Sequence, residues 1–145
     1  MPAMLERIEK TLRGELPPAP IATLLGFRLL SARPGEAVVE LEADERHANP
    51  MGTLHGGVLC DIADAAMGIA YACALEEGET FTTLELKISY LRPVWKARLK
   101  AVGRVVKQGR TIGYVECDVT DEKGREIARA ACTCMTLRGE QARGR

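Results

Sequence analysis

Two glycines follow a histidine where a long helix is predicted to begin. His55, Gly56 and Gly57 open an apolar stretch that favours a helix over residues 56–75. The first turn of a helix has unpaired backbone N–H groups and a partial positive charge, so it can bind an anion or polarise a carbonyl oxygen. Because glycine has no side chain, a substrate can approach those groups closely. A plain tight turn is the alternative interpretation of the two glycines.

Two aspartates lie on one face of this predicted helix. At about 100° per residue, Asp61 and Asp64 share a face with small residues only: Ala65, Gly68 and Ala72. The opposite face carries apolar residues that can pack on a sheet: Val58, Ile62, Ile69 and Cys73. An exposed helix face normally carries long charged side chains. This face instead leaves room for another backbone or a ligand beside two carboxylates. An ordinary solvent-exposed face is the alternative.

Periodicity and turn residues predict the elements that must position these groups. An amphipathic helix is expected over 3–14, a proline-rich connector over 16–20 and a helical turn over 21–25. Strands are expected over 27–32 and 36–42, followed by a polar loop over 44–54. After the long helix, four strands and a flexible polar tail are predicted over 80–91, 97–107, 111–120, 126–137 and 138–145.

The strand over 80–91 shows the clearest alternation. Its apolar face would carry Leu84, Leu86, Ile88 and Tyr90, and its polar face Thr83, Glu85, Lys87 and Ser89. Tight hairpins between consecutive strands indicate an antiparallel sheet, and the apolar helix needs cover from it. We therefore predict an α+β fold in which a curved antiparallel β-sheet wraps around the long central helix. The chain would form one domain over 1–145, with an N-terminal helix and connector over 1–20.

Composition excludes several classes of protein. Lys plus Arg and Asp plus Glu both number 20, so the chain lacks the broad positive charge of a nucleic-acid-binding protein. The longest uncharged stretch in the helical middle, 65–75, is short of the roughly 20 residues of a membrane span. The N-terminus becomes charged before a signal-peptide core forms, so we expect a cytoplasmic protein. Its five cysteines form no C-x-x-C pair, and with only two histidines we expect no metal site. Cys132 and Cys134 are expected to be packed strand thiols.

The segment HANPMGTLHGGVLCDIADAAMG, followed by TLELKISYLRPV and KQGRT, resembles the hotdog-fold acyl-CoA thioesterases of the phenylacetate-degradation (PaaI-like) type. The resemblance runs from about Gly26 to Leu137. It implies a long helix wrapped by an antiparallel sheet, and assembly as a homodimer or a homotetramer. It also implies an acyl-CoA substrate, with no cofactor because CoA is part of that substrate. From the charge balance and the short apolar stretches, we expect no nucleic-acid or membrane partner.

The resemblance also implies roles for particular residues. The glycine whose N–H polarises the carbonyl corresponds to Gly56, and the catalytic acid corresponds to Asp64. An upstream amide corresponds to Asn49, the histidine before the glycine to His55, and a hydroxyl early in the next strand to Thr83. The family gives Asp61 no such role. Substrate contacts are expected from Gly57. Because CoA carries phosphates, a basic rim is also expected, with Arg92, Lys107 and Arg110 as the candidates. Ordinary solvated surface charge is the alternative for each of the three, and the family gives Arg110 no clear role.

Helix geometry constrains how these groups can cooperate. Gly56 and Asp64 are eight residues apart, which is about 12 Å along a helix axis. A reacting carbon must lie about 3 Å from both the nucleophile and the oxyanion donors. The two groups of one chain therefore cannot serve one carbonyl, whereas Gly56 of one subunit and Asp64 of another can. The small-residue face would leave room for that second subunit.

The expected reaction is hydrolysis of an acyl-CoA to a carboxylic acid and free CoA. The Gly56 N–H would stabilise the oxyanion, and Asp64 would act as general base or as nucleophile. Two other functions stay open. A hotdog-fold dehydratase of 3-hydroxyacyl thioesters would hydrate a crotonyl thioester, and a non-catalytic acyl-CoA-binding module would bind without releasing thiol.

Overall fold

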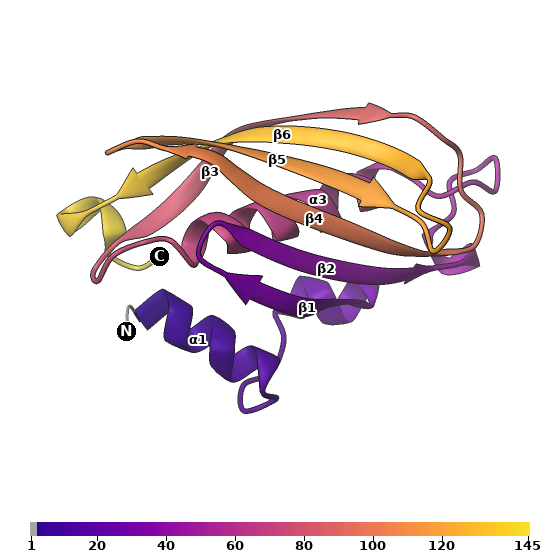
Figure 1. The fold of residues 1–145 in the computed structure, drawn as a ribbon. Helices are drawn as coiled ribbons and strands as arrows, with labels where there is room; N and C mark the ends of the chain where they lie inside the picture. The colour runs from indigo at the N-terminus through magenta and orange to yellow at the C-terminus, as the bar shows by residue number, and fades with distance from the viewer. Residues whose placement is uncertain (1–2) are drawn as a thin grey trace.

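The computed structural model describes residues 3–145 and has the predicted α+β architecture (Figure 1). Two short helices, α1 (Ala3–Leu12) and α2 (Pro20–Leu25), precede the strands β1 (Phe27–Arg33) and β2 (Glu36–Ala43). A 3-10 helix, η1 (Glu45–His47), lies in the loop that leads to the long helix α3 (Gly56–Ala72). Four strands and a 3-10 helix complete the chain: β3 (Thr80–Tyr90), β4 (Ala97–Gln108), β5 (Ile112–Thr120), β6 (Glu126–Leu137) and η2 (Gly139–Ala142).

All six strands form one antiparallel sheet in the order β1-β2-β4-β5-β6-β3. Hairpins join β1 to β2, β4 to β5 and β5 to β6. β2 pairs with β4, and β3 crosses over to pair with β6. The strand that directly follows α3 therefore lies at an edge of the sheet. Figure 1 shows α3 beneath the curved sheet, with α1 beside β1. This is the predicted arrangement of a sheet wrapped around a helix.

Two glycines in the sheet allow α3 to lie directly on it. A Cβ atom on Gly103 in β4 would lie 2.5 Å from the Ala66 carbonyl oxygen, so any side chain there would push the helix away. In β5, Gly113 leaves space for the ring of Tyr71, which packs against the position of a side chain. The Tyr71 hydroxyl forms a buried hydrogen bond of 2.7 Å with Thr136. The height of α3 above the sheet is thus fixed by backbone contact.

The structure corrects the extent and the faces of the long helix. α3 ends at Ala72 rather than at residue 75, because the chain turns there and buries Leu75 in the core. Gly68 and Ala72 are buried, and Gly68 lies under the ring of Phe81. The small-residue face is therefore open only near its start, around the two aspartates and Ala65.

The alternation of β3 is also only partly as predicted. The register with β6 shifts between Thr83 and Glu85, so Leu84 is an extra residue in a bulge. Leu86 and Ile88 are half-buried, but Leu84 and Tyr90 are each 53% exposed. The apolar face that we expected to be packed is therefore exposed at these two positions in the single chain.

The ends of the chain differ slightly from expectation. The N-terminal helix ends two residues early, and the expected flexible tail contains η2. Across residues 3–145, no helix combines the length and the apolar character that crossing a membrane requires.

Candidate active site

The two aspartates of α3 border an open groove between this helix and β3. The groove has a volume of about 300 Å³ and is lined by Cys60, Asp61, Asp64 and residues 83–86. A larger hollow of about 430 Å³ lies at the ends of β2 and β4. Two of its charged groups are already paired, since Lys96 lies 3.2 Å from Glu45 and Asp44 lies 2.9 Å from Arg46. The groove beside the aspartates is therefore the better candidate site.

Asp64 interacts with the neighbouring strand. The Thr83 hydroxyl donates a hydrogen bond of 3.4 Å to Asp64 Oδ1. Burial raises the pKa of Asp64, and the hydrogen bond from Thr83 partly opposes that rise. Burial and the charge of Asp64 both raise the pKa of Asp61. Two carboxyl groups whose charged forms are disfavoured thus lie side by side on the open part of the helix face.

At the start of α3 the N–H of Gly56 is free. His55 precedes the helix, and its Nδ1 accepts a hydrogen bond of 2.9 Å from the Gly57 N–H. The Val58 N–H donates to the His55 carbonyl at 3.0 Å. Between residues 3 and 145, no atom accepts a hydrogen bond from the Gly56 N–H. Gly56 therefore offers the unpaired donor, whereas the N–H of Gly57 is already used within the loop.

The glycines make room for side chains of this chain, which differs from our expectation. A Cβ on Gly56 would lie 2.7 Å from Cζ of Tyr90, and a Cβ on Gly57 would lie 3.0 Å from Nδ1 of His55. The Tyr90 hydroxyl also lies 3.3 Å from the Cys60 sulfur. Alternation along the strand predicted Tyr90 on a packed apolar face, which is wrong for this residue. Alternation along β3 carried no signal for this contact, because it depends on where β3 ends relative to the start of α3.

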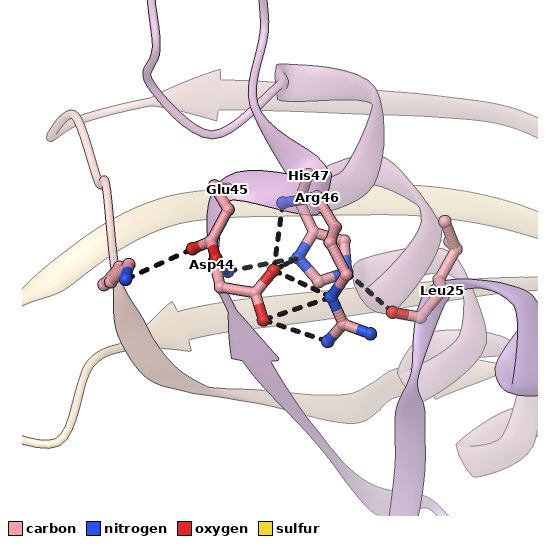
Figure 2. A network of polar contacts seen from close by, with 6 residues as sticks. Leu25, Asp44, Glu45, Arg46 and His47 are labelled. Atoms are coloured by element: carbon pink, nitrogen blue, oxygen red, sulfur yellow. Dashed lines mark hydrogen bonds and ion pairs between the residues drawn. The ribbon is translucent and has the colours of Figure 1, made fainter.

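The loop before α3 is held by a network around His47 (Figure 2). Its buried ring accepts a hydrogen bond of 3.1 Å from the Asp44 N–H and lies 2.7 Å from the Leu25 carbonyl oxygen. The carboxylate of Asp44 is paired with Arg46, which lowers the pKa of Asp44 to about 2. The His47 carbonyl then accepts a hydrogen bond of 2.9 Å from the N–H of His55. His47 thus connects α2 to the residue that precedes α3.

Asn49 is engaged in the same loop. Its Nδ2 donates to Thr53 Oγ1 at 2.8 Å, and its Oδ1 accepts from the Met51 N–H at 2.9 Å. These bonds stabilise the turn between residues 49 and 53. One amide hydrogen and one lone pair of Asn49 remain for other partners.

The expected basic residues do not form one patch. Arg92 follows β3 and contacts the start of β6, where its N–H donates to the Ile127 carbonyl at 3.3 Å. Lys107 and Arg110 lie at the β4–β5 hairpin, which adjoins the other end of β6. All three side chains are exposed. Only Arg92 belongs to the end of β3 at which Tyr90 contacts Gly56.

The groups that could bind a metal ion are dispersed. In the part of the chain that the structure describes, no three His, Cys, Asp or Glu side chains cluster around a common point. The thiols of Cys132 and Cys134 are buried in β6, with their sulfur atoms 3.7 Å apart.

Comparison with known proteins gives a consistent result. The family model described as the thioesterase superfamily matches residues 51–128. Human acyl-coenzyme A thioesterase 13 is 28% identical over 92% of this chain and 96% of its own length. The proofreading thioesterase EntH of Klebsiella pneumoniae is 32% identical over 76% of this chain and 77% of its own length. A solved structure of the phenylacetic acid degradation protein PaaI of Thermus thermophilus, a mutant form, superposes with a TM-score of 0.77. It is 31% identical and covers 82% of this chain and all of its own.

Proposed function

Because this chain belongs to the thioesterase superfamily and has the hotdog fold of its PaaI-like members, we propose that it hydrolyses an acyl-CoA to a carboxylic acid and free CoA. The name of the human relative supports the substrate class. The observation that carries the proposal is the pairing of Asp64 with the Thr83 hydroxyl in an open groove on α3. The reaction uses water and requires no cofactor.

The carbonyl oxygen of the thioester would accept a hydrogen bond from the Gly56 N–H. This donor is free, and it lies at the positive end of a 17-residue helix. Negative charge that develops on the oxygen in the transition state would be stabilised there. His55 also has a part, because its Nδ1 acts as an acceptor and its proton is therefore on the exposed Nε2. That N–H can donate to the substrate.

Asp64 would supply the attacking group in one of two ways. As a general base it takes a proton from water, which then attacks the carbonyl carbon. As a nucleophile it attacks the carbon itself, the C–S bond breaks and the CoA thiolate leaves, and water hydrolyses the resulting anhydride. Thr83 would orient the carboxylate, and the free amide hydrogen of Asn49 would orient the water. A single turnover in ¹⁸O-labelled water tests the nucleophilic route. If water attacks the Asp64 carbonyl of the anhydride, the label enters the Asp64 side chain, whereas the general-base route puts it in the released acid.

The proposed site would be completed by a second copy of the chain. Gly56 and Asp64 are eight residues apart in α3, or about 12 Å along its axis. A reacting carbon needs both within about 3 Å, so the acid would come from the partner in a homodimer or homotetramer. The open helix face around Asp64 and the exposed Leu84 on the edge strand β3 support a partner at this surface. Arg92 is better placed than Lys107 or Arg110 to meet a CoA phosphate beside Gly56.

The test is a panel of acyl-CoAs with thiol release as the readout. Asp64→Asn should lose about 10²- to 10⁴-fold in rate. Asp61→Asn is the matched control, because it removes a neighbouring carboxylate of the same helix face. If Asp61→Asn loses the activity and Asp64→Asn keeps it, the wrong aspartate has been assigned. Hydration of crotonyl-CoA without thiol release would indicate a dehydratase, and tight binding without either reaction would indicate a binding module.

A further inference from the structure

The ring of Tyr90 lies against the first residue of α3. Tyr90 is the last residue of β3, and its Cζ, hydroxyl oxygen and Cε1 would lie 2.7, 2.8 and 3.0 Å from a Cβ on Gly56. The side chain is nonetheless 53% exposed, so it can be reached from outside. A half-exposed phenol thus lies beside the unpaired N–H of Gly56 at the start of the helix.

The Tyr90 hydroxyl has a weak partner. It lies 3.3 Å from the sulfur of Cys60, one helical turn after Gly56. A thiol is a weak hydrogen-bond donor and a weak acceptor, so a carbonyl oxygen that gains negative charge would compete well for the hydroxyl proton. The bond with Cys60 raises the pKa of Tyr90 to about 12, and burial adds to the rise. The hydroxyl therefore keeps its proton at neutral pH.

The distances allow one oxygen to contact both donors. Backbone geometry places a Cβ about 2.5 Å from its own nitrogen. Since the hydroxyl is 2.8 Å from the Cβ position, it lies at most about 5.3 Å from the Gly56 nitrogen. Two donors that each lie about 2.9 Å from one oxygen can be as far as about 5.8 Å apart.

We propose that the Tyr90 hydroxyl is a second hydrogen-bond donor to the thioester oxygen, acting beside the Gly56 N–H. This inference rests on the proposed thioesterase function and adds a catalytic residue to it. The bond between the hydroxyl and Cys60 holds the phenol in place before substrate arrives. During the reaction the hydroxyl turns from sulfur to the oxyanion, and no covalent bond to Tyr90 forms or breaks.

Tyr90→Phe tests the role of the hydroxyl alone, because the ring that packs on Gly56 stays. We expect kcat for acyl-CoA hydrolysis to fall about 10- to 100-fold, with KM changed by less than about threefold. Cys60→Ala is the companion variant, since it removes the sulfur and keeps the hydroxyl. It should lose much less activity than Tyr90→Phe. If Cys60→Ala loses as much, the hydroxyl acts only as a link between β3 and α3, and the proposal is wrong.

A binding measurement separates hydrogen bonding to the oxyanion from packing of the Tyr90 ring. A trifluoromethyl ketone analogue of acyl-CoA hydrates to mimic the tetrahedral oxyanion, whereas a methyl ketone analogue mimics the substrate. Tyr90→Phe should weaken binding of the first about tenfold more than binding of the second. If Tyr90→Phe weakens binding of the two analogues equally, the role of Tyr90 is wrong. The same holds if Tyr90→Phe leaves kcat unchanged while Asp64→Asn abolishes activity. Neither result would affect the thioesterase proposal itself. If the wild-type protein releases no thiol from any acyl-CoA, the thioesterase proposal itself fails, and this one fails with it.

Discussion

Mixing two inactive variants tests whether the site is shared between subunits. Gly56→Pro removes the N–H that would polarise the carbonyl, at the first position of α3, where proline is compatible with a helix. Asp64→Asn removes the acid. The two positions are about 12 Å apart along the helix. Each substitution should therefore remove one of the two groups that a shared site takes from different subunits. Each variant by itself should therefore be nearly inactive.

The expected recovery follows from the symmetry of a dimer. A mixed dimer contains two sites, one that combines both lesions and one that carries neither. Random exchange of equal amounts makes about half of the dimers mixed, so half of those sites, or about a quarter of all sites, become intact. Activity of the mixture should therefore reach about a quarter of the wild-type value. Two variants of a site contained in one chain would recover nothing.

The assay measures thiol release as the two variants exchange subunits. Exchange is verified independently, by mass spectrometry of differently tagged copies. The proline also places a carbon against the Tyr90 ring, 2.7 Å from Cζ. Gly56→Ala places the same carbon there and keeps the N–H, so it measures the effect of that contact alone. Verified exchange without recovery would refute a site that combines Gly56 of one subunit with Asp64 of the other.

Four further changes have defined outcomes. Burial raises the pKa of Asp64, so the ionised carboxylate destabilises the fold at any pH above that pKa. Below the pKa of the unfolded chain, near 4, the group is protonated in both states and the effect is absent. Asp64→Asn should therefore raise the melting temperature slightly at pH 7 and not at pH 3. Thr83→Val removes the hydrogen bond that opposes this shift, so the acidic limb of the pH–rate profile should move to higher pH; an unmoved limb would reduce Thr83 to scaffolding. His47→Ala leaves the Asp44 N–H and the Leu25 carbonyl without their partner, so urea denaturation should show a loss of about 2–4 kcal/mol in the free energy of unfolding. An unchanged midpoint would show that the network around His47 does not stabilise the loop. Gly103→Ala would press a methyl group on the backbone of Ala66, so calorimetry should show a loss of about 1–3 kcal/mol in the free energy of unfolding. An unaltered melting curve would show that α3 can move away from the sheet without cost.

The sequence predicts the elements well where local patterns determine them. The start of α3 follows from His55 and two glycines, since the cap and the change to helical periodicity occur at the same place. The turn at 108–110 follows from its short polar composition between two alternating runs. The end of α3 is harder to place, because no proline or glycine marks it. Burial of Leu75 determines where the chain turns, and that is a tertiary effect.

Contacts between distant segments explain what the sequence could not give for the site. Which part of the helix face is open depends on where β3 lies. Gly68 looks like part of an open face in the sequence, yet Phe81 of β3 covers it. Asn49 looks available in the sequence, yet its amide bonds stabilise its own loop. Tyr90 reads as one more apolar position in an alternating strand. Its contact with Gly56 arises only because β3 ends beside the start of α3.

The contact of α3 with Gly103 and Gly113 has a consequence for how this protein can evolve. One side of the helix is set on the backbone of the sheet, so substitutions there change the fold before they change the chemistry. The other side faces the groove, where a change at the exposed Leu84 alters shape without moving the helix. Substrate preference can therefore drift by single substitutions while the catalytic geometry stays fixed. Selection for a new acyl group should collect its first mutations on that outward side.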